Sequence, residues 1–68
     1  MSVATVTEQT VSLVQAIAKY LPQVAALVPT HKLNFISVYE DAVVARFSRY
    51  DAEDHYFYIA PGREPVEV

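Results

Sequence analysis

The sequence contains no cysteine, no tryptophan and a single glycine, Gly62. Without cysteine there can be no disulfide, no thiolate zinc site and no thiol nucleophile. With one glycine, the chain has no glycine-rich loop of the kind that cradles phosphate groups or dinucleotides. Disulfide stabilisation and several common kinds of catalytic site are therefore excluded.

Basic residues are few, and long hydrophobic runs are absent. The chain has five Lys and Arg against eight Asp and Glu, a net charge of −3 that disfavours binding to nucleic-acid backbones and anionic membranes. The apolar residues are interrupted too often for a membrane span, and the N-terminus lacks the basic flank and apolar run of a secretory signal. We therefore expect a cytoplasmic protein that does not enter membranes, for which nucleic acid is not the expected partner.

The chain is short, with 68 residues, of which 53% are hydrophobic. That hydrophobic content is typical of a folded protein, because disordered chains are poor in aliphatic and aromatic residues. A single core of this size rarely supplies more than about 3–5 kcal/mol of net stability. We predict one domain spanning residues 1–68, with residues 1–4 and 61–68 frayed or extended, which needs a second subunit to be stable.

The N-terminal half has the hydrophobic period of an amphipathic helix. Thr5 followed by Glu8 fits a capping box, which places the helix start near residue 5 or 6. Pro22 should remove one helical hydrogen bond, but it lies opposite the apolar stripe, whose period continues unchanged. The pattern predicts one helix, kinked at Pro22 and ending near Val28, with two coaxial helices as the alternative. Apolar spacings of three and four define the stripe as Val3, Val6, Thr10, Leu13, Ile17, Tyr20, Val24 and Leu27.

From Lys32 onward, β-branched and aromatic residues dominate, as is typical of strands. Three strands fit, over residues 32–39, 42–50 and 55–60, and Pro61 with Gly62 ends the third. The predicted fold class is therefore α+β, with one N-terminal, Pro-kinked amphipathic helix packed on a three-stranded antiparallel β-meander.

Both faces of the predicted sheet are largely apolar. If each hairpin loop has an even number of residues, residues directly opposite each other share a face, and Phe47 lies opposite Tyr58. A single helix can cover only one face, so the other would form an exposed apolar patch typical of an interaction site. We expect pairing with another chain, and the sheet face, the edge strand and the helix all remain possible contact surfaces. One predicted face carries Ile36, Val38, Val43, Ala45, Phe47, Tyr56, Tyr58 and Ala60; the other carries Leu33, Phe35, Tyr39, Val44, Arg46, Tyr50, Phe57 and Ile59.

Candidate chemical sites are sparse. The only histidines are His31 and His55, and three carboxylates precede His55, at Asp51, Glu53 and Asp54. No HExxH motif or spaced calcium loop is present, and a run of acidic residues between strands is typical of a solvated turn. None of the serines has the strand-to-helix context of a nucleophile. We therefore predict no catalytic residue, no metal and no cofactor, and do not expect an enzyme.

Aromatic residues and arginines concentrate on the predicted strands. Tyr, Phe and Arg anchor many protein interfaces, and an arginine on the middle strand should stack on an aromatic ring or meet a carboxylate of a partner. The resulting hypothesis is a non-enzymatic homodimeric adaptor or regulatory module that binds a protein partner. The alternative is a small module that stacks single-stranded nucleic acid on the aromatic side chains of its sheet. The predicted partner-binding residues are Phe35, Tyr39, Arg46, Tyr50 and Phe57.

Overall fold

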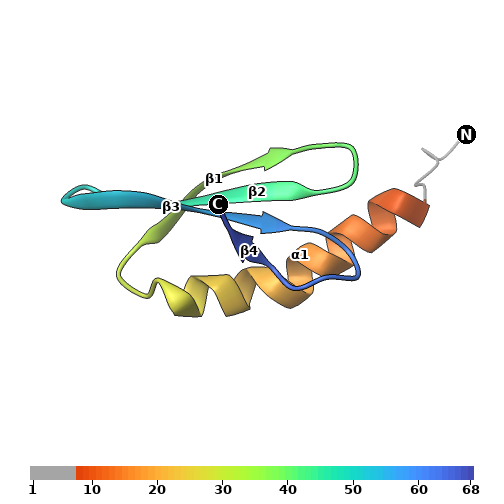
Figure 1. Cartoon of the computed structure of the whole chain (residues 1–68), viewed down its shortest axis with the longest axis horizontal. Coiled ribbons are helices and arrows are strands. Elements are labelled where there is room, and N and C mark those ends of the chain that lie inside the picture. Colours follow the sequence, from red (N-terminus) through yellow and green to blue (C-terminus); the bar gives the residue numbers. More distant parts are fainter. Residues whose placement is uncertain (1–7) are drawn as a thin grey trace, which may run out of the picture.

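The computed structural model describes residues 8–68, which form one helix and one antiparallel sheet (Figure 1). The predicted α+β fold is confirmed, and a short fourth strand is added to the three expected ones. The capping box at Thr5 and the start of the predicted helix lie outside the described residues. The elements are α1 (Glu8–Leu27), β1 (Lys32–Val38), β2 (Val43–Arg49), β3 (Ala52–Ile59) and β4 (Val66–Glu67), and the strand order is β1-β2-β3-β4.

Helix α1 runs without interruption through Pro22, so one helix forms and not two. A kink at Pro22 stays a prediction. The helix ends one residue before the expected Val28, ahead of Pro29. Leu27, placed in the apolar stripe by its spacing, is 70% exposed in the last turn, so its predicted burial is wrong. The buried residues of α1 follow a stripe that includes a small alanine, and they are Leu13, Ala16, Tyr20 and Val24.

Next to its turn, the first hairpin has the predicted register, with Val38 opposite Val43 and Phe35 opposite Arg46. A β-bulge between Leu33 and Phe35 places Leu33 opposite Phe47, so the predicted position of Leu33 on the face of Phe35 is wrong. The predicted register of the third strand is wrong, because Phe47 lies opposite His55 and not opposite Tyr58. Between the pair Phe47 with His55 and the pair Arg49 with Ala52, β3 has two residues, Glu53 and Asp54, where β2 has one, Ser48. The extra residue is a β-bulge, and a shift of one residue moves every later side chain to the opposite face.

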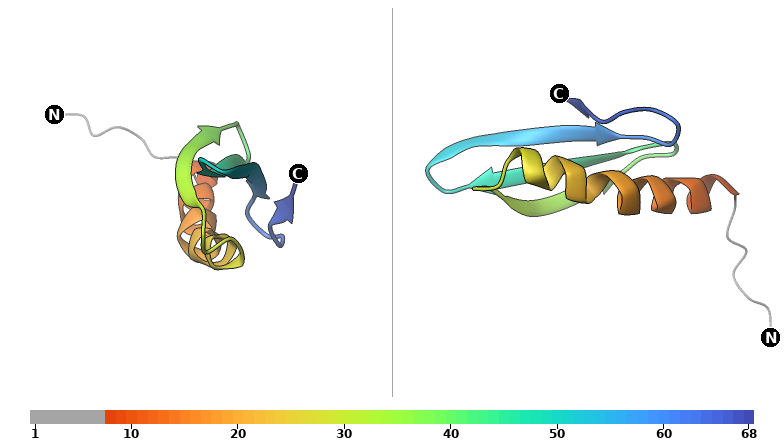
Figure 2. Two further views of the ribbon diagram at one scale, coloured as in Figure 1. Left: turned by 90° about the vertical axis from the view of Figure 1, so that its left-hand side faces the viewer. Right: turned by 90° about the horizontal axis from the view of Figure 1, so that it is seen from below.

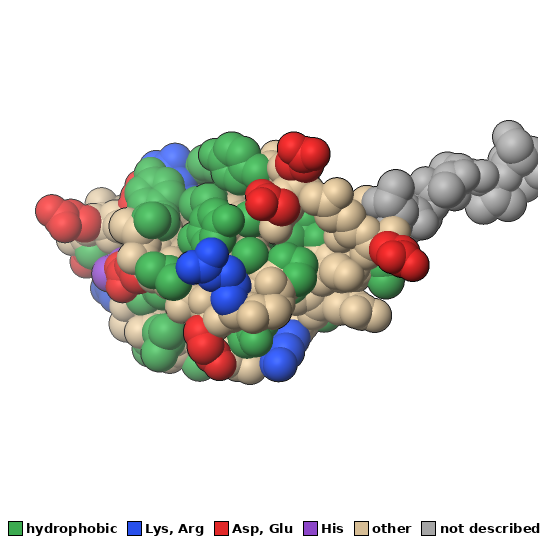
Figure 3. Space-filling model, turned by 45° about the vertical axis from the view of Figure 1, so that its right-hand side comes forward, with side chains coloured by type: hydrophobic (Ala, Val, Ile, Leu, Met, Phe, Trp, Pro, Cys, Tyr) green, Lys and Arg blue, Asp and Glu red, His purple; other side chains and the backbone are tan. Residues whose placement is uncertain are grey.

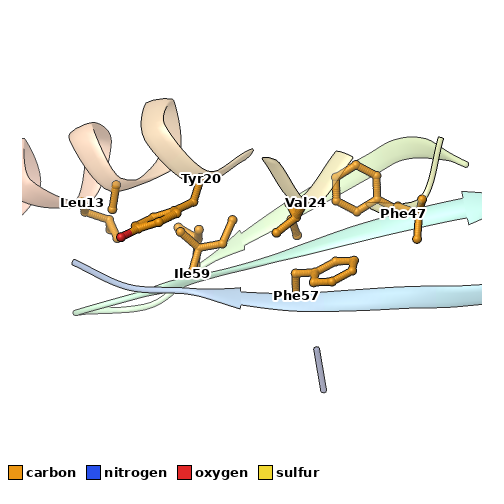
Figure 4. Packing of buried hydrophobic residues seen from close by; sticks show 10 residues of the cluster. Leu13, Tyr20, Val24, Phe47, Phe57 and Ile59 are labelled. Carbon is orange, nitrogen blue, oxygen red and sulfur yellow. The ribbon is translucent and has the colours of Figure 1, made fainter. Parts of the chain in front are cut away.

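The inverted third strand places Phe57 and Ile59 against the helix, in the hydrophobic core. In Figure 4, Leu13, Tyr20 and Val24 of α1 lie over Ile59, Phe57 and Phe47 of the sheet. The rings of Phe47 and Phe57 meet edge to face, with centroids 5.8 Å apart and planes at 81°. The core therefore fills the space between α1 and one face of the sheet.

The C-terminal tail, predicted to be frayed or extended, contains the short strand β4. It follows a turn at Gly62, whose positive φ of 76° is a conformation that glycine adopts without steric cost. In β4, Val66 lies opposite Tyr58, and the backbone N–H of Val68 donates to the carbonyl oxygen of Tyr56 at 2.9 Å. The tail thus adds a fourth strand to the sheet, at the edge beside β3.

Candidate protein-interaction surface

The sheet has a face turned away from α1, which we call the outer face. Strand pairing assigns its members, since residues directly opposite each other project to the same side. Phe35, Arg46 and Tyr56 form a row across its middle, one residue from each of three neighbouring strands. Within residues 8–68, the single helix packs on the opposite face (Figures 1 and 2). The outer face consists of Phe35, Ser37, Tyr39, Val44, Arg46, Asp54, Tyr56, Tyr58, Val66 and Val68.

Arg46 is held in a fixed position at the centre of this face. Its guanidinium carbon lies 5.4 Å from the ring centroid of Phe35 and 5.9 Å from that of Tyr56, within the range of cation–π attraction. Its Nε donates to Oδ2 of Asp54 at 2.8 Å, and its Nη2 lies 2.5 Å from the same oxygen. The predicted stacking of Arg46 on an aromatic ring is confirmed. Its carboxylate comes from the same chain, so a partner does not have to supply one.

Apolar side chains surround Arg46 and are partly exposed to solvent. Phe35 is 44% exposed, Tyr56 38% and Val66 47%. The guanidinium carbon of Arg63 lies 5.7 Å from the centroid of the Tyr58 ring. In the space-filling view of Figure 3, hydrophobic side chains gather in the middle of the visible surface around Lys or Arg side chains, with Asp and Glu mostly round its periphery. Exposed aromatics held beside an arginine have the composition of protein-interface cores.

The structure brings together only some of the predicted partner-binding residues. Phe35 and Arg46 are neighbours in the middle of the outer face, and Tyr39 follows at the end of β1. Tyr50 lies in the turn at the opposite end of the sheet, is 97% exposed, and borders a separate hollow of about 500 Å³. Phe57 is 4% exposed in the core, on the face opposite to the outer face, so the face predicted for it is wrong, together with the register of β3.

The outer face includes residues that the sequence-based prediction missed. Tyr56 and Tyr58 occupy the positions predicted for their neighbours on β3, because the bulge shifts them to the outer face. Val66 and Val68 lie on the outer face because the C-terminal segment pairs with β3. The alternation of apolar and polar residues over 66–68, after a Pro-Gly turn, is a strand signal that could have identified the last two. Asp54 carries no comparable signal, since in the sequence it belongs to a polar turn.

The two histidines lie together at the margin of the core. The rings of His31 and His55 meet edge to face with centroids 4.8 Å apart. Nδ1 of His55 lies 2.5 Å from Oε2 of Glu67, a residue of β4, whereas Asp51 and Asp54 pair with arginines. No group of three His, Asp or Glu within residues 8–68 is placed to hold a metal ion. The contact between His55 and Glu67 instead ties β4 to the rest of the sheet.

No helix in the described part of the chain is long and apolar enough to cross a membrane. Comparisons with protein-family models, with curated proteins and with solved structures found no match to this chain. Its function has to be inferred from the placement of its own residues.

Proposed function

We propose that this chain is a non-enzymatic protein-interaction module, an adaptor or regulatory protein that acts in the cytoplasm as a homodimer. The observation that supports this proposal is the outer face, an aromatic and aliphatic surface of the sheet that lies opposite the helix-packed core. Contiguous exposed patches of this kind mark interaction sites.

The middle row of the outer face is suited to binding because it is already organised. Arg46 is stacked on Phe35 and Tyr56 and paired with Asp54, so these side chains have little conformational freedom left to lose on binding. Arg46 and Asp54 neutralise each other, and the guanidinium of Arg63 lies over the ring of Tyr58. The partner expected from this chemistry presents a mainly apolar surface.

The homodimer follows from the size of the domain. A core of this size supplies about 3–5 kcal/mol, and association is the usual supplement in a chain without disulfides. Association also removes apolar surface from water, which is the main favourable contribution to binding.

The test uses two tyrosines that differ in position alone. Tyr56→Ala removes one of the two aromatic rings on which Arg46 stacks. Tyr50→Ala instead removes a tyrosine that is almost fully exposed, in a turn away from the outer face. We expect wild type and Tyr50→Ala to retain the same proteins from a cell extract, identified by quantitative mass spectrometry, and Tyr56→Ala to lose a defined subset. Circular dichroism verifies that both variants are folded. Identical protein sets for all three would refute the outer face as the binding surface.

One observation favours a second function, the binding of single-stranded nucleic acid. An arginine between two aromatic rings on an open sheet is an arrangement on which bases can stack. Against it stand the carboxylate that already neutralises Arg46 and the net charge of −3. Titration of labelled oligonucleotides at low salt, where any phosphate attraction is strongest, decides the matter. An unchanged fluorescence anisotropy would eliminate this function.

A further inference from the structure

A hollow outside the hydrophobic core lies at one end of the sheet. Its lining comes from the loop after α1, the start of β1 and the end of β2 with the turn that follows. Figure 1 shows this end of the sheet at the left. The volume of the hollow is about 500 Å³, and small-molecule sites usually have volumes of about 300–1,000 Å³. The hollow is therefore large enough for a small ligand.

The lining of this hollow is rich in hydrogen-bond donors. Every lining side chain except that of Leu33 carries a donor, and none of the lining residues in the described part of the chain is acidic. Two of them are cations, in a chain whose net charge is −3. Donors and positive charge without a carboxylate favour an anionic ligand. The donor-bearing residues are Thr30, Lys32, Asn34, Ser48, Arg49 and Tyr50.

Both cations keep donors for a ligand. Lys32 makes no ion pair within residues 8–68. Arg49 is paired with Asp51, through its Nε at 2.5 Å from Oδ1. Because a guanidinium has five N–H donors in a planar fork, the contact through Nε leaves its terminal N–H groups for a second oxyanion. Asp51 offsets part of the charge of Arg49, whereas the charge of Lys32 is not offset.

Two irregularities of the sheet lie beside Ser48. Lys32 lies opposite Ser48, and β1 then has its bulge at Asn34. On the other side of β2, the bulge of β3 is also opposite Ser48. Bulges redirect side chains and are over-represented next to functional sites. The backbone is thus irregular on both sides of the residue at the middle of the lining.

The bulge in β1 brings Asn34 into contact with Ser48. Nδ2 of Asn34 donates to Oγ of Ser48 at 3.0 Å. Because the Ser48 oxygen accepts this bond, its hydroxyl proton is free to donate to a ligand, as is the second amide hydrogen of Asn34. Two neutral donors are therefore held together beside Lys32, the residue opposite Ser48.

We propose that this hollow binds the phosphate monoester of a small molecule that also carries a ring or another apolar group. A phosphate monoester has a charge of about −1.5 to −2 at pH 7 and three acceptor oxygens, which suit two cations and a pair of neutral donors. A carboxylate has one charge and two oxygens. The apolar part packs on Leu33, which is 44% exposed, and on the ring of Tyr50, which is 97% exposed and so free to cover a ligand. This site does not depend on the proposed function.

Titration of isotope-labelled protein with phenyl phosphate tests the site, with backbone amide chemical shifts as the readout. We expect saturable shifts confined to residues 30–34 and 48–50, and a dissociation constant about tenfold lower than that of benzoate, which has the same ring with a carboxylate. The absence of saturable shifts, or shifts spread over the whole surface, would refute the site. Equal affinity for benzoate would refute the preference for phosphate.

Two lysine variants separate this site from general attraction to positive charge. Lys32→Ala removes a charge-assisted hydrogen bond, so we expect the dissociation constant for phenyl phosphate to rise about tenfold. The matched control is Lys19→Ala, which removes a lysine of α1 whose Nζ lies 5.0 Å from the centroid of the Tyr20 ring and which does not line the hollow. The control should bind like wild type, and the amide spectra verify that both variants are folded. Equal losses in the two variants would overturn the proposal.

A serine variant tests the neutral donors without a change of charge. Ser48→Ala removes the hydroxyl that accepts from Asn34, and we expect a several-fold loss of affinity for phenyl phosphate, which Ser48→Thr restores. Unchanged affinity in Ser48→Ala would show that the pair of Asn34 and Ser48 does not bind the ligand.

A short peptide that contains phosphotyrosine distinguishes the source of the phosphate. It presents the same phenyl phosphate group on a polypeptide. Affinity no higher than that of phenyl phosphate supports a small molecule as the ligand. Affinity higher by about tenfold or more would show that the site recognises a phosphorylated protein instead and would overturn the proposal.

Discussion

Two adjacent residues of β3 should respond to truncation in opposite ways. Phe57 is 4% exposed, and its ring packs against Phe47 in the core. Removal of a buried phenylalanine side chain in Phe57→Ala costs about 3–5 kcal/mol, through lost hydrophobic burial and the cavity that remains. This cost equals the whole net stability of about 3–5 kcal/mol that a domain of this size draws from its core. We therefore expect Phe57→Ala to be largely unfolded at room temperature.

Tyr56 precedes Phe57 in the chain but lies on the outer face. It is 38% exposed, and its described contact is with the guanidinium of Arg46, 5.9 Å from the ring centroid. Such a contact near the surface contributes about 0.5–1 kcal/mol. With some loss of partly buried ring area, we expect Tyr56→Ala to cost about 1 kcal/mol, which lowers the melting temperature by roughly 4–8 °C in a domain of this size.

Urea unfolding followed by far-ultraviolet circular dichroism measures both free energies of unfolding. All samples need one protein concentration, because the stability of a dimer depends on concentration. The predicted result is a folded Tyr56→Ala and an unfolded Phe57→Ala. If Tyr56→Ala were the more damaging substitution, β3 would have the opposite orientation and the outer face would be wrongly assigned.

Three further substitutions test the supporting contacts. Gly62→Ala should cost about 1–2 kcal/mol from the positive φ alone, since no atom lies within 4 Å of the added Cβ, and an unchanged melting temperature would contradict this. Asp54→Asn should cost about 1 kcal/mol by leaving Arg46 without its carboxylate, and the difference from wild type should shrink in 1 M salt; a salt-independent difference would argue against the ion pair. Glu67→Gln should release β4 from His55, so that the amide of Val68 exchanges faster with solvent while amides of α1 do not; equal exchange in wild type and variant would show that this contact does not hold β4.

The fold class could be predicted because each part of it leaves a periodic signal. The recurrence of apolar residues at spacings of three and four identified the helix through Pro22, and β-branched and aromatic enrichment identified three strands. The first hairpin was correct from Phe35 to Val38, because its two-residue turn preserves the phase of the side chains, but the β-bulge between Leu33 and Phe35 was not predicted.

The face assignment of β3 could not be predicted in the same way. A bulge inserts one residue inside a strand, and nothing in the alternation of Tyr56, Phe57 and Tyr58 distinguishes which phase is buried, because both are aromatic. Hydrophobic pattern determines register only where one phase is polar. Of the predicted site, Phe35 and Arg46 therefore came together on the outer face, whereas Phe57 entered the core.

The carboxylate beside Arg46 shows a second limit of sequence reasoning. Asp54 was assigned to a solvated turn, yet it pairs with an arginine on the neighbouring strand. Strand β3 begins at Ala52 and not at the predicted His55, so Asp54 lies within the sheet. A long-range ion pair of this kind depends on the register, which the sequence pattern left open.

The most direct test of the homodimeric module is the mass of the purified full chain in solution. Sedimentation equilibrium over a range of micromolar concentrations should give a species of twice 7.6 kDa that dissociates on dilution, with helix content falling as monomer appears. A species of 7.6 kDa that keeps its full helix content at every concentration would contradict the account, because the domain would then be stable without a second copy.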